Sequence, residues 1–176
     1  MKKIIIALFL TLVLFSSAFA QTTTEVPVIN WADVEEAAAD IEGSWYTFEY
    51  YNIDVWVPDV LVDTEVTEAD GEGVISKFVT ADNSAAMVLQ YIEGNDGTPI
   101  EEVAAGITEA GGKDVEICKL NGLDALTYSL PDIDGIYVVV LPDAEDYLQF
   151  YFTPASDEGF NAVAMLITAS IMPSEE

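Results

Sequence analysis

The sequence predicts an α+β domain in which helices pack on an antiparallel β-sheet, an arrangement similar to an α/β/α sandwich. Most of the chain between residues 44 and 153 consists of short runs rich in aromatic and β-branched residues, separated by polar turns. Three further segments have apolar residues at the helical period. Links of hairpin length between the runs favour antiparallel pairing, because parallel strands need long crossover connections.

The first twenty residues have the features of a secretory signal peptide. Lys2 and Lys3 precede an apolar run from Ile4 to Leu14, and Ala18 and Ala20 form the small-residue pattern that signal peptidase reads. This run is shorter than the roughly 20 residues of a membrane-spanning helix, and no Cys follows directly for lipid attachment. We therefore expect a secreted or periplasmic protein without stable membrane insertion.

After the signal peptide, the chain is expected to have three parts. Residues 21–43 form an N-terminal segment with a helix from Trp31 to Glu42, capped by Asn30. Residues 44–173 form the α+β domain, and residues 174–176 form a short tail. This length suits one domain.

Within the domain, eight runs read as strands and two segments as helices. The first helix has Thr98 as its N-cap and ends at Gly111 and Gly112, and the second starts at Ser156 and should be the most deeply packed. Asn121-Gly122 is the strongest hairpin signal, because both residues tolerate a positive φ. The predicted strands are residues 44–50, 53–58, 74–80, 85–94, 114–120, 123–130, 135–141 and 146–152.

The order of these elements resembles the PsbP-like α+β domains, which include small secreted bacterial proteins. The resemblance spans about Trp45 to Met172 and rests on the layout of "YYNIDVWVPDVL", "PIEEVAAGI", "KLNGLDALTYSL", "GIYVVVLP", "YLQFYFTP" and "ASIMP". Its nearest approach to a motif is Leu120-Asn121-Gly122 followed by Ala125 and Tyr128. The resemblance implies a binding or accessory role without enzymatic activity, and it names no ligand.

Composition excludes several classes of function. The chain has 5 basic and 32 acidic residues and a net charge of −27, which repels nucleic acids and anionic lipid headgroups. It contains neither His nor Arg, so the usual catalytic triads, transition-metal sites and bidentate phosphate clamps are absent. Cys118 stands alone in a strand-like pattern and should be a buried, inert thiol.

Calcium needs only oxygen ligands, but the acidic turns do not predict a dedicated site. Asp132 and Asp134 are separated from Asp143 and Asp146 by a six-residue strand, roughly 20 Å long. We expect Asp132 and Asp134 to shape a turn with Pro131 and Gly135. The end of the sheet that carries Asp124, Asp143 and Asp146 should bind divalent cations only weakly and non-specifically. No metal site and no cofactor are expected.

The candidate binding residues are Trp45, Tyr51 and Trp56 beside Glu49 and Asp54. Strand alternation places these aromatics on one face, and it assigns the opposite face, which is core, to Tyr46, Phe48, Tyr50, Ile53, Val55 and Val57. Flat aromatics next to carboxylates suit a protein or glycan partner. In the alternative interpretation, the N-terminal helix covers this face with Trp31, Val34 and Ile41.

A second class of function is a carboxylate-dependent hydrolase that acts on glycans. Such enzymes place two carboxyl groups roughly 5 to 10 Å apart across a cleft, one of them with a raised pKa, and Glu49 and Asp54 are a candidate pair. Because 32 acidic residues always contain some pair at that distance, the pattern favours the binding function and leaves no residue assigned to catalysis.

Overall fold

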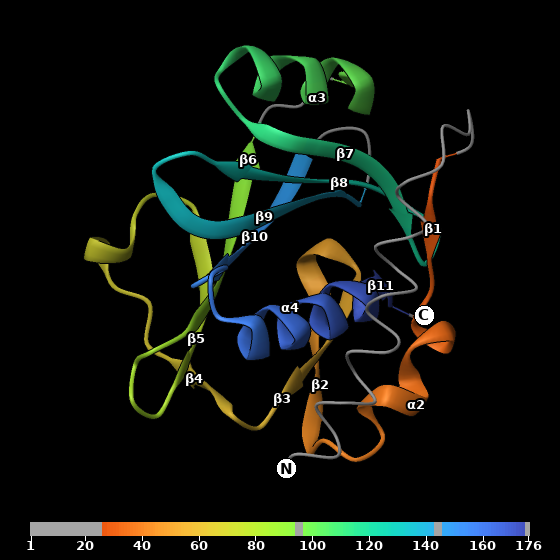
Figure 1. Ribbon diagram of the computed structural model, residues 1–176. Helices are drawn as coiled ribbons and strands as arrows, with labels where there is room; N and C mark the ends of the chain where they lie inside the picture. The colour runs from red at the N-terminus through yellow and green to blue at the C-terminus, as the bar shows by residue number, and fades with distance from the viewer. Residues whose placement is uncertain (1–25, 94–96, 143–145, 175–176) are drawn as a thin grey trace.

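The fold is built mainly from strands (Figure 1). The computed structural model describes residues 26–93, 97–142 and 146–174, so the predicted signal peptide lies outside the described residues. The strands are β1 (Val28–Ile29), β2 (Gly43–Phe48), β3 (Ile53–Pro58), β4 (Leu61–Thr64), β5 (Val74–Thr80), β6 (Ala86–Glu93), β7 (Lys113–Leu120), β8 (Leu123–Leu130), β9 (Ile133–Leu141), β10 (Asp146–Thr153) and β11 (Met172–Pro173). The helices are η1 (Trp31–Asp33), α2 (Glu35–Ala38), η2 (Glu49–Tyr51), η3 (Glu68–Asp70), α3 (Ile100–Glu109) and α4 (Glu158–Ser170).

The strands form two sheets. The large sheet has eight strands in the order β1-β7-β8-β9-β10-β6-β5-β4, and the small sheet has three in the order β11-β3-β2. All neighbours pair antiparallel except β1 and β7, which are parallel. The α+β class is therefore confirmed, but the strands are divided between two sheets. Strand β3 is buried on both of its faces, and a strand of this kind needs packed layers on either side.

The Asn121-Gly122 hairpin is confirmed. Leu120 pairs with Leu123 at the ends of β7 and β8, and the two turn residues have φ values of 48° and 94°. These left-handed conformations are those of a type I′ turn, whose twist matches that of the flanking strands.

The main core lies on the inner face of the large sheet. Phe78, Phe150 and Phe152 project from this face and are at most 1% exposed. They pack against residues of β3 and α4, which together form the second layer beneath the sheet in Figure 1. Burial of this many aromatic and aliphatic side chains is the largest favourable contribution to folding.

Helix α3 lies over the outer face of the large sheet at its β7–β8 end. Ile100 and Ala104 are buried against Leu126 and Val139. The helix begins one residue later than predicted, because Pro99 occupies the N-cap position without a side-chain cap hydrogen bond. Its predicted end is confirmed, since the N–H of Gly112 donates to the carbonyl oxygen of Ile107 at 2.9 Å.

The predicted helix from Trp31 to Glu42 is wrong in length. The segment forms the short turns η1 and α2 instead, and Asn30 makes no side-chain cap. A short helix gains little from its own hydrogen bonds, so packing decides the conformation. Here Val34 and Ala38 are buried against Trp56, and the backbone N–H of Trp31 donates to the β7–β8 turn.

Helix α4 is the most deeply packed helix, as expected. The carboxylate of Asp157 caps its N-terminus by accepting a hydrogen bond from the N–H of Phe160 at 2.9 Å. Ile167 and the flanking Ile171 are fully buried between the two sheets. Across the described ranges of the chain, no helix is both long enough and apolar enough to span a membrane.

Candidate binding surface

The predicted aromatic site is partly covered. Trp45 and Trp56 pair across β2 and β3, but Trp56 is 6% exposed whereas Trp45 is 47% exposed. The ring centroid of Trp31 lies 5.5 Å from that of each indole, and Val34 and Ala38 pack on Trp56. The N-terminal segment therefore covers Trp56, as in the alternative interpretation, and Trp45 remains at the rim.

The turn between β2 and β3 breaks the strand alternation on which the predicted site depends. Glu49, Tyr50 and Tyr51 form η2, and Asn52 follows in a left-handed conformation with φ of 51°. Tyr50 is consequently 83% exposed, although alternation placed it in the core. Tyr51 packs on the main core instead, with its ring centroid 5.4 Å from that of Tyr91. Glu49 is exposed at the start of this turn.

Asp54 has a structural partner near the end of the chain. Its Oδ1 accepts a hydrogen bond from the hydroxyl of Ser174 at 3.0 Å, which ties β3 to the residue after β11. Tyr51 and Trp56 belong to different packing clusters. The five predicted residues therefore do not share one face.

Cys118 is buried, as predicted, and is 2% exposed. Burial and, to a smaller extent, the charge of Glu116 raise the pKa of its thiol to about 12. A thiol of this kind is not a nucleophile at physiological pH. Within the described ranges, no group of three or more His, Cys, Asp or Glu residues could hold a metal ion.

The acidic turn residues have other partners. Asp124 accepts a hydrogen bond from Lys119 Nζ at 2.7 Å, in an exposed ion pair. Asp146 lies at the start of β10, whereas Asp143, the third residue expected to bind cations weakly, lies outside the described residues. The proximity of these three carboxylates remains a prediction.

The predicted turn around Asp134 needs correction. Leu130 pairs with Ile133, so the turn itself is Pro131-Asp132 and Asp134 lies within β9. The carboxylate of Asp134 accepts hydrogen bonds from the N–H of Ser156 at 2.7 Å and from its hydroxyl at 2.5 Å. These bonds lower the pKa of Asp134, and they hold the loop before α4 against β9.

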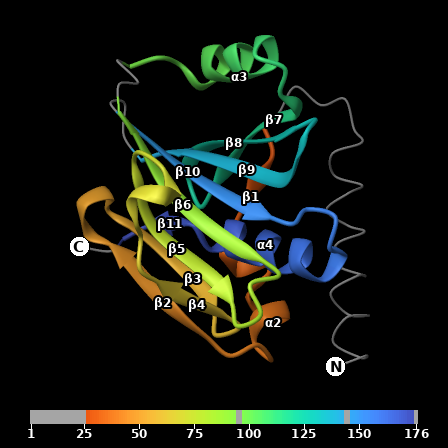
Figure 2. The same cartoon turned by 90° about the vertical axis from the view of Figure 1, so that its left-hand side faces the viewer.

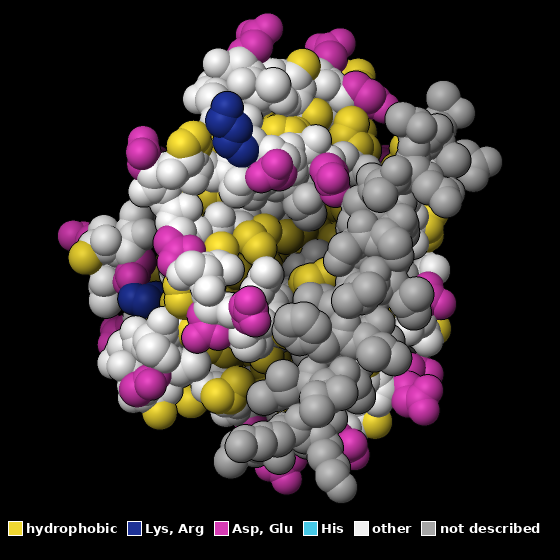
Figure 3. Space-filling view, viewed as in Figure 1, with side chains coloured by type: hydrophobic (Ala, Val, Ile, Leu, Met, Phe, Trp, Pro, Cys, Tyr) yellow, Lys and Arg dark blue, Asp and Glu magenta, His cyan; other side chains and the backbone are white. Residues whose placement is uncertain are grey.

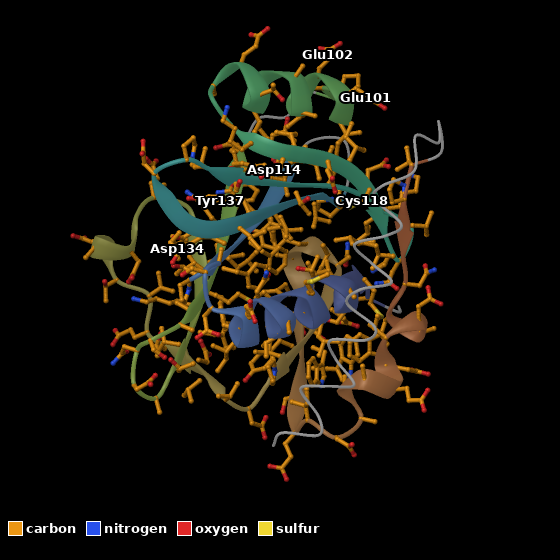
Figure 4. All side chains as sticks on the ribbon, in the orientation of Figure 1. Glu101, Glu102, Asp114, Cys118, Asp134 and Tyr137 are labelled. Atoms are coloured by element: carbon orange, nitrogen blue, oxygen red, sulfur yellow. The ribbon has the colours of Figure 1, made fainter. Side chains whose placement is uncertain are left out.

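Three tyrosines, here called the tyrosine row, lie side by side on the outer face of the large sheet. Tyr137 of β9 pairs with Tyr128 of β8 and with Tyr151 of β10. Adjacent rings are stacked, with centroids 4.7 Å apart and interplanar angles of 12° and 29°. Figure 4 shows Tyr137 close to Asp134 on β9 and well separated from Cys118.

A chain of hydrogen bonds extends from the tyrosine row across the sheet. The hydroxyl of Tyr128 donates to Gln149 Oε1 at 2.8 Å, and Gln149 Nε2 donates to Gln90 Oε1 at 3.2 Å. Gln90 Nε2 then donates to the carbonyl oxygen of Glu72 at 2.8 Å. Because an amide nitrogen has two N–H groups, each Gln retains a second donor for a ligand or for water.

Gly135 leaves space for the ring of Tyr151 at the end of the tyrosine row. The register of β8 and β9 shifts between Ser129 and Leu130, which makes Asp134 and Gly135 extra residues in β9. The ring of Tyr151 lies against Gly135, where a Cβ atom would be 2.2 Å from Tyr151 Cε2. The bulge and the missing side chain therefore set the position of Tyr151 in the row.

Tyr128 and Tyr137 act as hydrogen-bond donors and apolar surfaces rather than as bases. Burial and the neighbouring Tyr137 raise the pKa of Tyr128 to about 12. Burial and Tyr151 also raise the pKa of Tyr137. Both hydroxyls are protonated at physiological pH, so the row provides ring area and hydrogen bonds for binding.

Beyond the row, the outer face continues over β6, β5 and β4 as a surface that we call the open half-face. Tyr151 is followed by Val88, Lys77 and Thr64 in successive paired positions, and the adjacent positions are Ala86, Val79 and Val62. Helix α3 contacts β7 and β8, and Figure 2 shows no α-helix in front of β5. The loop that carries η3 borders this face, and the Lys77–Asp70 ion pair and the hydrogen bond from Gln90 to Glu72 join it to β5 and β6. Val62, on the edge strand β4, is 53% exposed.

Sequence reasoning missed both surfaces. The tyrosines alternate with buried residues along their strands, a signal that places each of them on the outer face. Their alignment in one row depends on the bulge at Gly135, and no sequence motif predicts that bulge. Strand β4 lies in a polar stretch of the sequence, so its residues show no clear alternation of apolar and polar side chains.

Comparisons with known proteins agree with this architecture. No protein-family model matches the chain, and no curated protein matches it. Among solved structures, its two-sheet α+β fold is similar to that of a PsbP protein. That protein is cyanobacterial PsbP (CyanoP) from Synechocystis sp. PCC 6803, with a TM-score of 0.56 over 76% of this chain and 93% of that chain, at 13% sequence identity. The predicted PsbP-like resemblance is confirmed at the level of the fold.

Proposed function

We propose that this chain is an exported, non-enzymatic binding or accessory protein that contacts its partner through the tyrosine row and the open half-face. One observation carries the proposal: three stacked tyrosines continue into a largely aliphatic surface over which Figure 2 shows no α-helix. Val62 is exposed, and the tyrosines, Val79 and Val88 are half-buried; contiguous apolar surface that solvent reaches on a monomer usually marks an interaction site. Tyr is enriched at interfaces because its ring buries area while its hydroxyl forms hydrogen bonds.

The chemistry of the side chains supports a binding role over catalysis. The sequence has no His, the Cys118 thiol is buried, and Tyr128 and Tyr137 hold their protons at neutral pH because their pKa values are raised. The hydrolase alternative needs two carboxyl groups across a cleft. Asp54 instead accepts a hydrogen bond from Ser174, and Glu49 lies in the exposed turn η2, so we do not propose this activity.

Export follows from the signal-peptide pattern of residues 1–20. An accessory role is in keeping with the PsbP-like fold. The net charge of −27 makes nucleic acids and anionic membranes unfavourable partners. The proposal therefore retains two partner classes, a protein or a glycan.

The test is an NMR titration of the isotope-labelled exported form with two probes, a short peptide of alternating Lys and Val and the oligosaccharide cellohexaose. We expect amide shifts from at least one probe to cluster on β8, β9, β10 and β6. Tyr137→Ser should weaken that binding about tenfold, as loss of a central aromatic anchor does, whereas Tyr50→Ser, at an exposed tyrosine outside the row, should leave it unchanged. Shifts that cluster around η2 or Trp45 for both probes would overturn the proposal.

A further inference from the structure

The open half-face belongs to a strongly acidic part of the chain. Residues 60–93, which contain β4, β5 and β6, include seven acidic residues and one lysine, Lys77. Lys77 Nζ forms an ion pair with Asp70 Oδ1, so this lysine offers little positive charge to a ligand. Figure 3 shows Asp and Glu side chains around a Lys or Arg side chain on the left of the molecule, where Figure 1 places η3, β4 and β5.

The loops that border the surface hold their carboxylates in place. Asp70 accepts hydrogen bonds from the N–H and hydroxyl of Thr67 at 2.9 and 2.8 Å. Asp82, in the β5–β6 turn, accepts from the N–H and hydroxyl of Ser84 at 3.1 and 2.7 Å. The partner Lys77 lowers the pKa of Asp70 to about 2, and Ser84 does the same for Asp82. Asp70 and Asp82 are therefore ionised throughout the physiological range.

One row of the open half-face is aliphatic and lies beside the row that contains Val88, Lys77 and Thr64. Val62 pairs with Val79, and Val79 pairs with Ala86, so three apolar side chains lie in successive positions across β4, β5 and β6. Strand β4 is an edge of the large sheet, which gives a partner access to this row from the side. An apolar row inside an anionic rim is complementary to a surface that has apolar side chains surrounded by cations.

We infer that the open half-face docks a cationic protein partner, whose apolar side chains cover Val62, Val79 and Val88 and whose lysine or arginine side chains pair with the exposed rim carboxylates Glu65, Glu72 and Glu93. The inference rests on the proposed function and names the partner class. A second copy of this chain fits poorly, because each copy has a net charge of −27. A glycan fits poorly as well, since the side chains of Val62, Val79 and Ala86 offer it no hydrogen-bonding groups.

The experiment compares two variants at matched positions. Val62 and Val28 are 53% and 57% exposed and lie on opposite edge strands of the same sheet. Val62→Lys and Val28→Lys change the net charge equally, but only Val62→Lys places a cation within the proposed surface. With the Lys-Val peptide as the probe, we expect Val62→Lys to weaken binding about tenfold and Val28→Lys to weaken it by less than about twofold. Thermal unfolding of both variants verifies that they fold.

A Glu-Val peptide of the same length is the control for charge, and it should not bind. If the two Lys variants weakened binding of the Lys-Val peptide equally, the inference would be overturned, because the overall negative charge of the protein would then explain the binding. Binding of cellohexaose but not of the Lys-Val peptide on β6 and β10 would overturn the cationic partner while leaving the proposed function intact. Dimerisation that Val62→Lys abolishes and Val28→Lys does not would also overturn it, in favour of a second copy.

Discussion

At the scale of single residues, Asn121 joins three segments that are distant in the sequence. Its Oδ1 accepts a hydrogen bond from the backbone N–H of Trp31 at 2.8 Å. Its Nδ2 donates to the carbonyl oxygens of Ala169 and Ile171, both at 2.8 Å. The residue that forms the β7–β8 turn thus also holds the N-terminal segment and the end of α4.

Replacing Asn121 by Asp should lower the free energy of unfolding by about 3 kcal/mol, because the carboxylate has no donor for the two carbonyl oxygens and leaves them unpaired. Urea denaturation measures the change. The control is Asn83→Asp, at an exposed residue with a similar left-handed backbone, φ of 58° against 48°, and it should have a small effect. Equal stability of Asn121→Asp and the wild type would show that these hydrogen bonds contribute little.

The tyrosine row predicts a dependence of stability on alkaline pH. The pKa of Tyr128 is about 12 in the folded state, against an ordinary value of 10.0, so the folded state keeps a proton that the unfolded state releases. The free energy of unfolding should therefore fall as pH rises from about 10 to about 12. Tyr128→Phe should remove part of this slope in urea titrations across that range. An unchanged slope in the variant would show that Tyr128 is not responsible.

At the scale of elements, the bulge in β9 makes a prediction about Gly135. Gly135→Ala places a Cβ atom against the ring of Tyr151 and should cost about 1 to 3 kcal/mol, as overpacking of a filled site does. The same variant should shift the aromatic NMR signals of the tyrosine row. Gly106→Ala is the control, because Gly106 lies in α3 with open space around its Cα. This change should stabilise the protein by about 0.5 to 1 kcal/mol.

How well an element could be predicted depends on whether its signal is local. Strands β5 to β8, β10 and the turn at Asn121-Gly122 agree with the sequence, because strand propensity and turn chemistry act over a few residues. Strand β9 was predicted as well, but it begins two residues earlier than expected, at Ile133. The bulge at Asp134 and Gly135 could not be predicted, since contacts with Tyr151 and Ser156 from other elements stabilise it. The prediction of a helix from Trp31 to Glu42 was wrong for the same reason. Contacts with other elements, namely the hydrogen bond from Trp31 to Asn121 and the packing of Val34 and Ala38 on Trp56, determine the conformation of this segment.

At the scale of the whole molecule, the division into two sheets determines which aromatics are available for binding. Strand alternation opposes Trp56 to Val55 and Val57, and the sequence left open whether that face binds a partner or is covered by the N-terminal segment. In the fold, β3 lies between the main core and the N-terminal segment, so both of its faces are buried. Whether Trp56 is buried depends on where Trp31 lies, and whether the tyrosine row is accessible depends on how far α3 extends over the sheet. The alternation of residues within a single strand predicts neither of these positions.

The net charge of −27 leads to a prediction about salt. Mutual repulsion of the carboxylates destabilises the compact state, and salt screens it over a Debye length of about 10 Å at 0.1 M. Salt also weakens the ion pairs of Lys77 with Asp70 and of Lys119 with Asp124, but such pairs contribute only about 0 to 1 kcal/mol each. Repulsion should dominate, so Tm at pH 7 should rise by several degrees, roughly 2 to 4 °C per kcal/mol, between low and molar NaCl. Choline chloride at equal ionic strength should give the same rise if screening is the cause. A Tm that falls with added NaCl would show that the attractive pairs outweigh the repulsion.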